Sequence, residues 1–575
     1  MFKLAKKYLP LFKKEVIVGP IFKWIEAVFE LIVPLVMAKI IDVGIPSSDK
    51  GYVIRMGLIM AGLGLVGLCS SLVCQYFASK ASQGIGTAMR RDIFRHINAF
   101  SYSELDRFGT SSIINVVTND VNQLQVAVAM LIRLVIRAPF LVLGAIVMSV
   151  FIDLQLSIII IIATPLIGLV LYLIMSKSIP FYRSIQKKLD KVSLITRENL
   201  TGVRVVRAFS KQDTEKQRFE QANDDFIRST VRINKLSALL SPAVSVILNF
   251  AIIAILSFGG HRVFNGALTQ GEIIALINYI NQIILAMIVV ANLVVIFTKS
   301  AASAARVNNI LDTEVTMKNG TEKLSDGIES IEFRDVSFSY NGTKNDIEGV
   351  TFSATSGTTV GVIGGTGAGK STLVNLIPRF YDISRGKILI NGRDITGYDM
   401  SSLRSAVGVV PQKAVLFSGT VRENLTMRKP DADDIEIMKA VKTAQAENVV
   451  ERFSEGLSGR VEQGGKNLSG GQKQRLTIAR ALVGDPPVLI LDDSASALDF
   501  ATDAALRKAL REDIDGKIVF IVSQRVSAVQ GADFIIVLDN GKVMGIGSDE
   551  QLRRTCPTYM EICRSQQGGG TADEE

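Results

Sequence analysis

The stretch VLILDDSASALD, at residues 488–499, is an apolar run that ends in two carboxylates. A short apolar run bounded by turn signals is typical of a buried strand. Asp492 therefore stands at the end of a predicted strand, where nucleotide hydrolases place a carboxylate for Mg²⁺. Asp493 follows it, where many of these hydrolases have a glutamate that handles the attacking water. An aspartate there is either a working substitute or the mark of a site that holds ATP without hydrolysing it efficiently.

A glycine-rich loop supplies the other half of such a site. The strand-like TTVGVIG runs into GGTGAGKST, and the helical TLVNLIPRF follows, which is the context in which G-x-x-x-x-G-K-[ST] binds phosphates. Backbone N–H groups close around the phosphates, and the start of the helix also favours negative charge. We expect Lys370 to reach the terminal phosphates, and the Ser371 hydroxyl to hold Mg²⁺ together with Asp492. The predicted nucleotide-binding residues of the loop are Gly364, Thr366, Gly367, Ala368, Gly369, Lys370, Ser371 and Thr372.

A second helix start suited to an anion lies shortly before the acidic strand. The segment NLSGGQKQRLTIARAL, residues 467–482, consists mostly of strong helix formers, and Ser469 is a good N-cap for it. Gly470 and Gly471 allow a phosphate to approach closely. Because the glycine-rich loop already holds the phosphates of its own nucleotide, this second helix start has no phosphate of its own within the chain.

The elements that position these residues differ between the two halves of the chain. Strands and helices alternate from about residue 315 onward, which predicts an α/β domain for the nucleotide site. Before it, long apolar segments raise the hydrophobic fraction of the 575-residue chain to 48%. Each can cross about 30 Å of hydrocarbon as a helix, whereas helices in soluble cores rarely run this long without charges. The six predicted membrane spans cover about residues 16–43, 52–79, 126–152, 154–176, 236–260 and 273–298.

Basic residues gather on one side of the predicted spans. Five lysines precede residue 15, and many Lys and Arg residues fall in 177–235, whereas the short connections at the other span ends contain few. Since cytoplasmic loops carry the excess of Lys and Arg, we expect a multi-pass protein of the cytoplasmic membrane with both termini in the cytoplasm. The net charge of +9 then belongs to inside loops beside anionic lipid, and it predicts no nucleic-acid partner.

Two of the predicted spans carry charged residues, which are expensive in a membrane and usually face protein or water. Lys23, Glu26 and Glu30 share one helical face, because they fall at positions i, i+3 and i+7. Arg133 and Arg137 lie one turn apart in another span. Two interpretations stay open. These residues either lie at cytoplasmic helix ends that protrude from the bilayer, or they line the inner mouth of a water-filled cavity between helices.

The motif LSGGQ, residues 468–472, stands between the glycine-rich loop and the acidic strand, and it is similar to the signature of ATP-binding-cassette (ABC) ATPases. Tyr340 in FSY, Gln412 in VVPQ and SALD at 496–499 match other marks of that family. Six spans followed by one cassette resemble one half of an ABC exporter, and the resemblance covers nearly the whole chain.

The resemblance implies a multidomain membrane protein. A six-helix all-α transmembrane domain of the type I exporter (type IV ABC) fold at 1–314 precedes an α/β P-loop ABC ATPase domain at 315–575. The loops at 100–120 and 197–212 match the coupling helices of the family, which carry motion between cassettes and spans. Two cassettes of this family pair head to tail, so each ATP lies between one chain's P-loop and the other chain's signature. The resemblance assigns Tyr340 to adenine, Gln412 to Mg²⁺ and catalysis, Leu468, Ser469, Gly470, Gly471 and Gln472 to the partner's ATP, and Ser496 and Asp499 to the D-loop.

Two residues depart from the family pattern. Asp493 stands where the family has Glu, and a carboxylate pulled back by roughly 1.3 Å cannot easily poise a water in line with the γ-phosphate. Gln524, in IVSQRVS, stands where the family has a switch histidine, and it lacks the imidazole that helps to order that water. The chain has two histidines, His96 and His261, and both precede the cassette. Asp493 and Gln524 in the catalytic positions therefore predict a degenerate ATP site.

An intact signature beside a weak ATP site makes sense when the partner is a different chain that carries the missing Glu and His. The pattern resembles one subunit of a bacterial heterodimeric multidrug ABC exporter, which implies ATP and Mg²⁺ as cofactors and small amphipathic compounds as substrates. Drugs, lipids and hydrophobic peptides suit the apolar spans equally well. An ATP-gated channel or a regulatory ABC subunit also stays open, whereas a soluble cassette ATPase conflicts with the six spans.

Overall fold

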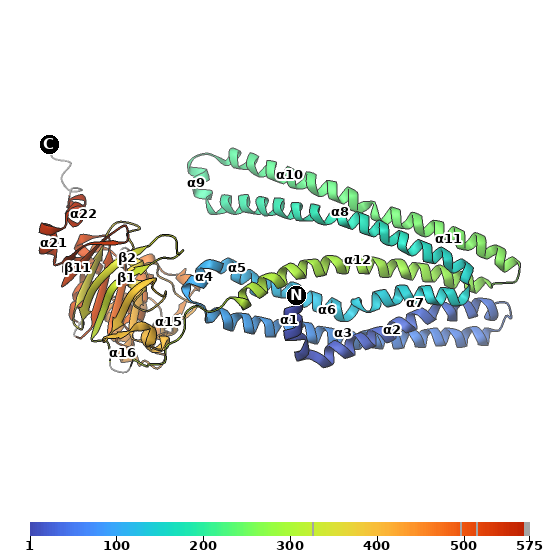
Figure 1. Cartoon of the computed structure of the whole chain (residues 1–575), viewed down its shortest axis with the longest axis horizontal. Coiled ribbons are helices and arrows are strands. Elements are labelled where there is room, and N and C mark those ends of the chain that lie inside the picture. The colour runs from blue at the N-terminus through green and yellow to red at the C-terminus, as the bar shows by residue number, and fades with distance from the viewer. Residues whose placement is uncertain (325–326, 495–496, 513–515, 568–575) are drawn as a thin grey trace. The chain divides into compact units, whose positions relative to one another are not determined.

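A computed structural model of the chain describes residues 1–324, 327–494, 497–512 and 516–567. It separates into two compact units, whose elements are labelled in Figure 1. The first, named the helical unit below, comprises Met1–Asn98 and Gly109–Thr313. The second, named the sheet unit, comprises Ala99–Phe108 and Glu314–Glu575. The segment Ala99–Phe108 thus belongs to the sheet unit, although the residues on both sides of it in the sequence belong to the helical unit.

The described residues of the helical unit form helices and turns. Its long helices are α2 (Lys13–Lys39), α3 (Lys50–Asn98), α7 (Arg137–Ile152), α8 (Leu154–Thr201), α10 (Gln212–Ala238), α11 (Leu240–Phe264) and α12 (Gln270–Asp312). The shorter elements are α1 (Phe2–Tyr8), η1 (Leu9–Phe12), η2 (Ile40–Gly44), α5 (Thr110–Asn115), η3 (Val116–Asp120), α6 (Val121–Met130), η4 (Leu131–Val135) and α9 (Val203–Ala208). α8 and α10 run side by side, and α9 joins them at one end (Figure 1).

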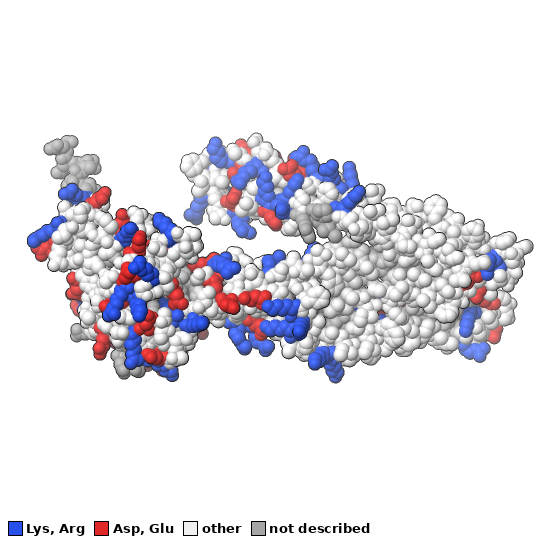
Figure 2. Space-filling view, in the orientation of Figure 1, with Lys and Arg blue, Asp and Glu red and all other residues white. Residues whose placement is uncertain are grey.

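Most of the long helices have the length and composition of membrane spans. Among the described residues, five segments qualify, namely Lys50–Asn98, Thr110–Ile152, Leu154–Ser178, Gln212–Phe264 and Gln270–Asp312. The 27-residue helix α2 is not one of them, because Lys23, Glu26 and Glu30 interrupt its apolar sequence. Figure 2 shows a broad band of the helical unit with few charged side chains, and Lys, Arg, Asp and Glu gather at its two ends. This distribution is that of a bundle which spans a membrane.

Polar side chains fix the turns at one end of the bundle. Asp153 caps α8 and forms an ion pair with Arg262 near the end of α11, at 2.7 Å. Thr269 and Glu272 form a capping box at the start of α12. Asp42, in η2, accepts a hydrogen bond from the Thr269 hydroxyl at 2.7 Å. These contacts tie together helix ends at this end of the bundle.

The sheet unit is built on a ten-stranded mixed sheet in the order β5-β4-β1-β2-β12-β11-β3-β10-β9-β6. Its strands are β1 (Ser330–Phe338), β2 (Ile347–Thr355), β3 (Thr359–Ile363), β4 (Arg385–Ile390), β5 (Arg393–Asp394), β6 (Val407–Val410), β9 (Val488–Asp492), β10 (Ile518–Ser523), β11 (Phe534–Asp539) and β12 (Lys542–Gly547). β7 (Gly419–Thr420) and β8 (Arg460–Val461) form a separate pair. The helices that bear on the site are α4 (Tyr102–Phe108), α13 (Lys370–Asn375), α18 (Gly470–Leu482) and α19 (Phe500–Glu512).

Parallel pairing brings the functional loops to one edge of this sheet. Ile363, the last residue of β3, pairs with Ser523, the last residue of β10. Asp492, the last residue of β9, pairs with Val522 of β10. β6 runs parallel to β9 on its other side. The loops after these four strands carry the glycine-rich loop, Gln412, Asp493 and Gln524, so residues far apart in the sequence meet at the carboxyl ends of the strands.

The two segments predicted as coupling helices have different positions. Segment 100–120 is divided, because α4 belongs to the sheet unit whereas α5 and η3 belong to the helical unit. Segment 197–212 contains α9 and lies within the helical unit.

Candidate functional site

The glycine-rich loop adopts a conformation that side chains would disturb. Gly369 precedes α13 with φ of +95°, in the left-handed region that glycine adopts at little cost. A Cβ on Gly364 would lie 2.2 Å from the backbone oxygen of Leu538, so the loop can pass this close to the neighbouring strand only without a side chain. The spacing of the motif therefore follows from the path of the backbone between β3 and α13.

Lys370 lies at the mouth of this loop. Its ammonium group donates hydrogen bonds to the backbone oxygens of Gly364, at 2.8 Å, and Gly365, at 2.7 Å. Burial lowers the pKa of Lys370, while the nearby carboxylates of Asp493 and Asp492 act in the opposite direction. A buried ammonium held by neutral carbonyls is well placed to gain from a negatively charged ligand.

A pocket of about 210 Å³ lies beside the lysine. It is lined by Asp346, Thr366, Gly367, Ala368, Gly369, Lys370, Ser371, Thr372, Gln412, Asp492, Asp493 and Gln524. Apart from Asp346, every one of these residues was predicted from the sequence. The sequence did not predict Asp346 or Gly365 as site residues. The Asp346 carboxylate accepts a hydrogen bond from the Tyr340 N–H at 2.9 Å, and the Gly365 backbone oxygen accepts one from Lys370 at 2.7 Å.

Two oxygen donors in this pocket fit a hard divalent cation. The Ser371 hydroxyl donates to the Asp492 carboxylate at 2.9 Å. Burial raises the pKa of Asp492, and the hydrogen bond from Ser371 opposes that effect. A buried carboxylate beside a hydroxyl gains most from a cation, and Mg²⁺ prefers oxygen ligands while keeping waters and phosphates as its others. Among the described residues no cluster of three or more His, Cys, Asp or Glu forms a separate metal site.

The two departures from the family pattern both lie at the pocket. Asp493 accepts a hydrogen bond from the Gln412 side chain at 3.4 Å, and the Thr366 hydroxyl donates to Gln524 at the same distance. The backbone of Asp493 has φ of +44°, in the left-handed region, and its N–H donates to Val522 at 2.9 Å. Aspartate tolerates this conformation better than most residues that have a side chain. The carboxylate of Asp493, which is shorter than that of a glutamate, is therefore oriented by a left-handed backbone conformation.

Tyr340 lies near α13, and 40% of this residue is exposed. Its hydroxyl donates to the hydroxyl of Thr372 at 3.2 Å, which fixes the ring beside α13. Burial of the remainder of the side chain raises the pKa of this tyrosine, so it is protonated near neutral pH. One face of a fixed aromatic ring is therefore available for a flat ligand next to the phosphate loop.

The signature residues form a separate helix start. Ser469 and Gln472 make a capping box, in which the serine oxygen accepts from the Gln472 N–H at 3.3 Å and the Gln472 side chain accepts from the Ser469 N–H at 2.9 Å. A Cβ on Gly470 would meet nothing within 4 Å. Leu468 is buried beneath them. None of these signature residues lines the pocket described above.

Of the two predicted D-loop residues, Asp499 can be placed. It starts α19 and accepts hydrogen bonds from the N–H and the hydroxyl of Thr502, both at 2.9 Å. These bonds lower the pKa of Asp499. Ser496 lies outside the described residues.

Comparison with known proteins identifies the family of the chain. Residues 16–287 match the family described as the ABC transporter transmembrane region, and residues 347–496 match the ABC transporter family of ATPase domains. An uncharacterized ABC transporter ATP-binding protein of Mycobacterium tuberculosis is 34% identical over 571 residues, with 98% of each chain covered. The chain belongs to the ABC transporters.

Further relatives agree with an exporter. The putative multidrug export ATP-binding/permease protein YgaD of Bacillus subtilis is 32% identical over 561 residues, covering 96% of this chain and 97% of the relative. The ATP-dependent lipid A-core flippase of Vibrio vulnificus is 28% identical over 573 residues, covering 99% and 98%. A bacterial Atm1-family ABC exporter solved with ATP bound has the same fold, with a TM-score of 0.80 at 23% identity over 98% of this chain and 100% of that one.

These findings confirm the predicted fold class, a transmembrane helical domain followed by an α/β ATPase domain. The chain is a membrane-embedded half-transporter of the ABC exporter type, and its ATP-binding domain belongs to the family that couples ATP hydrolysis to transport.

Four of the charged residues predicted in this ABC transporter's first and third spans form a connected group. Lys23 pairs with Glu26 at 2.6 Å, and Arg137 pairs with Glu30 at 2.6 Å and lies 4.0 Å from Glu26. Four charges thus neutralise one another along α2 and the start of α7. Arg133 has no carboxylate partner among the described residues, and its closest polar contact is the Ser79 hydroxyl at 3.4 Å. The periodicity predicted the shared faces, whereas the pairing between helices emerged only from the structure.

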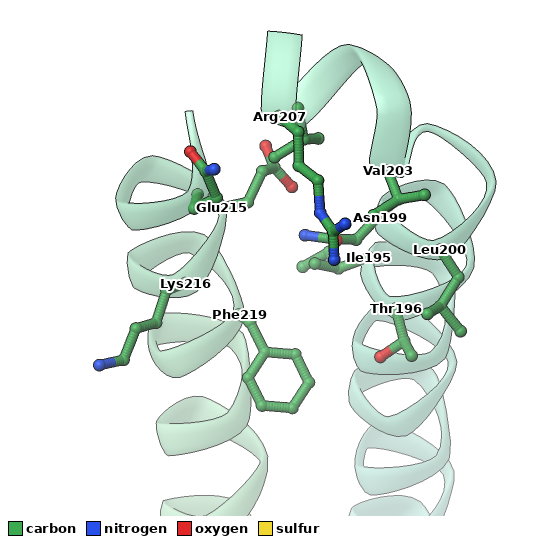
Figure 3. A pocket seen from close by; sticks show the side chains of 11 residues that line it. Ile195, Thr196, Asn199, Leu200, Val203, Arg207, Glu215, Lys216 and Phe219 are labelled. Atoms are coloured by element: carbon green, nitrogen blue, oxygen red, sulfur yellow. The ribbon is translucent and has the colours of Figure 1, made fainter. Parts of the chain in front are cut away.

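The tip of the α8–α10 hairpin contains a pocket of about 370 Å³, lined by α8, α9 and α10. Figure 3 shows Arg207 and Phe219 directed into the space between the two long helices, whereas Lys216 points outward. Apolar side chains are exposed on α9 and directly after it, with Val205 60% and Phe209 71% exposed. The segment predicted at 197–212 therefore presents an apolar surface of the transporter that nothing in the described residues covers.

Proposed function

We propose that this chain is the degenerate-site subunit of a heterodimeric ABC exporter that moves small amphipathic or hydrophobic compounds, of the multidrug type, across the cytoplasmic membrane. The observation that carries the proposal is the pairing of Asp493 and Gln524 in the nucleotide pocket with an intact signature outside it. A homodimer of this chain would contain two weakened sites, whereas a partner with the missing Glu and His would use this chain's sound signature.

At this chain's own site, the residues divide into binding and poising roles. Lys370 and the backbone of the glycine-rich loop hold the phosphates, and Tyr340 stacks on the adenine. Ser371, Asp492 and Gln412 hold Mg²⁺, which would neutralise part of the phosphate charge when bound. Asp493 and Gln524 fill the positions that poise the water, but the aspartate is one methylene short and the glutamine supplies no imidazole. The site therefore keeps ATP bound and hydrolyses it slowly.

At the partner's site, this chain supplies the start of α18. Ser469, Gly470 and Gly471 meet the phosphates of the partner's ATP, Leu468 and Gln472 hold the helix start in place, and Ser496 and Asp499 contribute the D-loop. The capping box supports this role because it fixes the helix start before any ligand arrives. Hydrolysis takes place mainly at this second site.

We assign residues 1–314 to the transmembrane domain and residues 315–575 to the ATPase domain. α2 is the first of six spans, and ion pairs join its charged face to α7. We infer a cytoplasmic N-terminus, C-terminus and pair of coupling segments, 100–120 and 197–212. The lysines before α2 and the basic residues of α8–α10 support this orientation, because cytoplasmic loops carry the excess of Lys and Arg. The exposed apolar face of α9 supports its assignment to coupling with an ATPase domain.

The substrate class is argued from the spans. α7, α8 and α12 enclose a pocket of about 620 Å³. Its lining, which includes Leu143, Tyr172, Met175, Met287 and Val294, is nearly all apolar, and methionines adapt to ligands of varied shape. The charged group of Lys23, Glu26, Glu30, Arg133 and Arg137 adds a polar cavity lining. An apolar pocket and a separate charged group in one bundle suit an amphipathic compound. The relatives named as a putative multidrug export protein and as a lipid A-core flippase support this substrate class.

The state of the nucleotide held by this chain tests the proposal. The co-purified pair is incubated with labelled Mg²⁺-ATP, crosslinked through a photoreactive nucleotide, and the label on each subunit is identified as ATP or ADP. We expect ATP to predominate on this chain and ADP on its partner, because the aspartate at 493 cannot support rapid turnover. Equal amounts of ADP on both subunits would contradict the degenerate site.

Lengthening the carboxylate alone should restore little activity. In Asp493→Glu the added methylene moves the carboxylate toward the water, but Gln524 remains, and the left-handed backbone of residue 493 suits glutamate less well than aspartate. We expect the ATP turnover of the pair to change by about twofold or less. The attacking water stays misplaced in this variant, and even a small misplacement at a reacting centre costs orders of magnitude in rate. Steady-state ATPase measurements check this, with Asp493→Ala as the matched control. If Asp493→Ala abolished transport as completely as removal of the partner's glutamate does, Asp493 would be a catalytic residue and the degenerate site would be contradicted.

A further inference from the structure

A row of aromatic rings in the sheet unit leads from α4 to Tyr340. The ring of Tyr102, on α4, lies 4.6 Å from that of Phe380 and 5.9 Å from that of Tyr381. The Tyr381 ring stands perpendicular to the Tyr340 ring, with centroids 5.1 Å apart. Perpendicular and tilted pairs at these distances are attractive contacts beyond simple burial. Tyr381 is thus the ring that touches both α4 and the tyrosine assigned to adenine.

A hydrogen bond anchors this ring to α4. The Tyr381 hydroxyl donates to the Asp106 carboxylate at 2.8 Å, across 275 positions of sequence. Burial, followed by the hydrogen bond to Asp106, raises the pKa of Tyr381, so the hydroxyl keeps its proton and remains a donor. On its other side Tyr340 is held by Phe338, at 4.8 Å between centroids, and by its own bond to Thr372. The adenine platform therefore has one support that depends on α4.

The neighbouring aromatic residue has a different set of contacts. Phe380 packs against Tyr102 and carries the Arg404 guanidinium 5.6 Å from its ring centroid, whereas among these described residues the ring in contact with Tyr340 is that of Tyr381. α4 is also tied to the sheet unit by Glu104, whose carboxylate accepts from the Thr316 hydroxyl. Phe380 and Glu104 thus attach α4 to the unit, and Tyr381 alone among these three residues also reaches the nucleotide platform.

We propose that Tyr381 is a positioning residue for ATP, which holds the Tyr340 ring in place for the adenine and links it to α4 through Asp106. The proposal rests on the stacking role given to Tyr340 above. Because binding linkage is reciprocal, any movement of α4 that loosens Tyr381 weakens ATP binding, and bound ATP resists that movement by the same factor. The intracellular segment at 99–108 and the nucleotide at the same chain's site are therefore coupled within one unit.

Two ligands separate the adenine contact from the phosphate contact. The affinity of the purified full chain is measured by calorimetry for a non-hydrolysable ATP analogue and for tripolyphosphate, both with Mg²⁺. We expect Tyr381→Leu to weaken binding of the analogue by about tenfold, in the range of one lost base–aromatic stack, and to leave tripolyphosphate binding unchanged. Tyr381→Phe should recover most of the loss, because the ring remains. The matched control Phe380→Leu removes the ring contacts with Tyr102 of α4 and with Arg404, and should change neither affinity by more than about twofold.

A double-mutant cycle tests the link to α4. Tyr381→Phe and Asp106→Asn each weaken the same hydrogen bond, so we expect each to lower the affinity for the ATP analogue two- to threefold, and the double variant to lower it no further. Additive losses, or no loss in either single variant, would overturn the link. If Tyr381→Leu weakened the binding of tripolyphosphate as much as that of the ATP analogue, the variant would disturb the structure of the whole site, and the positioning role would be overturned.

One further variant keeps this inference distinct from the proposals on which it rests. If Tyr340→Leu leaves the affinity for the ATP analogue unchanged, the adenine assignment itself is wrong. If Tyr340→Leu weakens that affinity and Tyr381→Leu does not, only the positioning role of Tyr381 fails. Tyr340, Tyr381 and the glycine-rich loop all belong to this chain, so both variants alter its own side of the nucleotide site and neither result tests the proposed heterodimer.

Discussion

Ser469→Arg is expected to abolish ATP hydrolysis by the assembled transporter, lowering turnover by at least about 100-fold, the usual loss when one donor to a developing negative charge is removed. In the capping box the Ser469 oxygen accepts a hydrogen bond, so its own proton is left to donate to a phosphate. Arginine offers no acceptor for the cap, and its bulk stands where α18 must close on the partner's γ-phosphate. Steady-state ATPase assays on the co-purified pair measure the effect.

The same variant should keep its own nucleotide site. None of the residues that line the pocket beside Lys370 belongs to the signature, so Ser469→Arg is expected to bind a photoreactive ATP analogue as tightly as the unaltered chain. This binding serves as the control for correct folding, since loss of one N-cap costs only about 1 kcal/mol.

Lys370→Ala is the matched comparison at the other site. It removes a charge-assisted contact with phosphate, worth about 1.5–3 kcal/mol, and should weaken ATP binding to this chain by roughly 10- to 150-fold. Turnover should persist in part, because the partner's own P-loop and glutamate are untouched. If Lys370→Ala lowered turnover more than Ser469→Arg, the assignment of active and degenerate sites would be reversed.

The second large effect concerns the partner. Purified alone, this chain is expected to hydrolyse ATP at a few per cent or less of the rate of the pair, because the shortened carboxylate and the missing imidazole weaken both sites of any homodimer. Co-expression with a half-transporter that carries the Glu and the His should restore turnover. ATPase activity of the chain in lipid nanodiscs, with and without the partner, measures the difference.

A variant of the partner supplies the control. Removal of the glutamate that follows the Walker B aspartate in the partner should return the pair to the low rate of this chain alone. Rapid hydrolysis by a homodimer of this chain, with the variant partner absent from the sample, would exclude the heterodimer as the working unit.

Residues that act through a continuous local motif were predictable. The glycine-rich loop, Lys370 and Ser371 lie within one strand–loop–helix, so their spacing fixes their arrangement once the local elements form. Asp492 was placed correctly at the end of a strand because an apolar run bounded by turns specifies a buried strand. A serine suited to N-capping, followed by strong helix formers, predicted the helix start at Ser469, and the structure confirms the capping geometry.

Contacts between distant segments were not predictable from local patterns. Helical periodicity placed Glu30 and Arg137 each on a face of its own helix, but the ion pair between them depends on how two helices pack. The bond between Tyr381 and Asp106 joins residues that sequence alone assigns to different domains. Local sequence periodicity could not have predicted that these two residues are in contact, because their proximity follows from the packing of α4 within the sheet unit.

The membership of Ala99–Phe108 in the sheet unit also bears on how the ATPase domain can be cut from the chain. A truncated gene product that begins at Glu314 would lack Tyr102 and Asp106, and so would expose the aromatic surface of Phe380 and Tyr381 to solvent. Such a fragment is not the complete folding unit, even though it contains every catalytic motif. Its solubility and nucleotide affinity would describe a domain with one helix removed, and the missing helix belongs, by sequence order, to the membrane half of the protein.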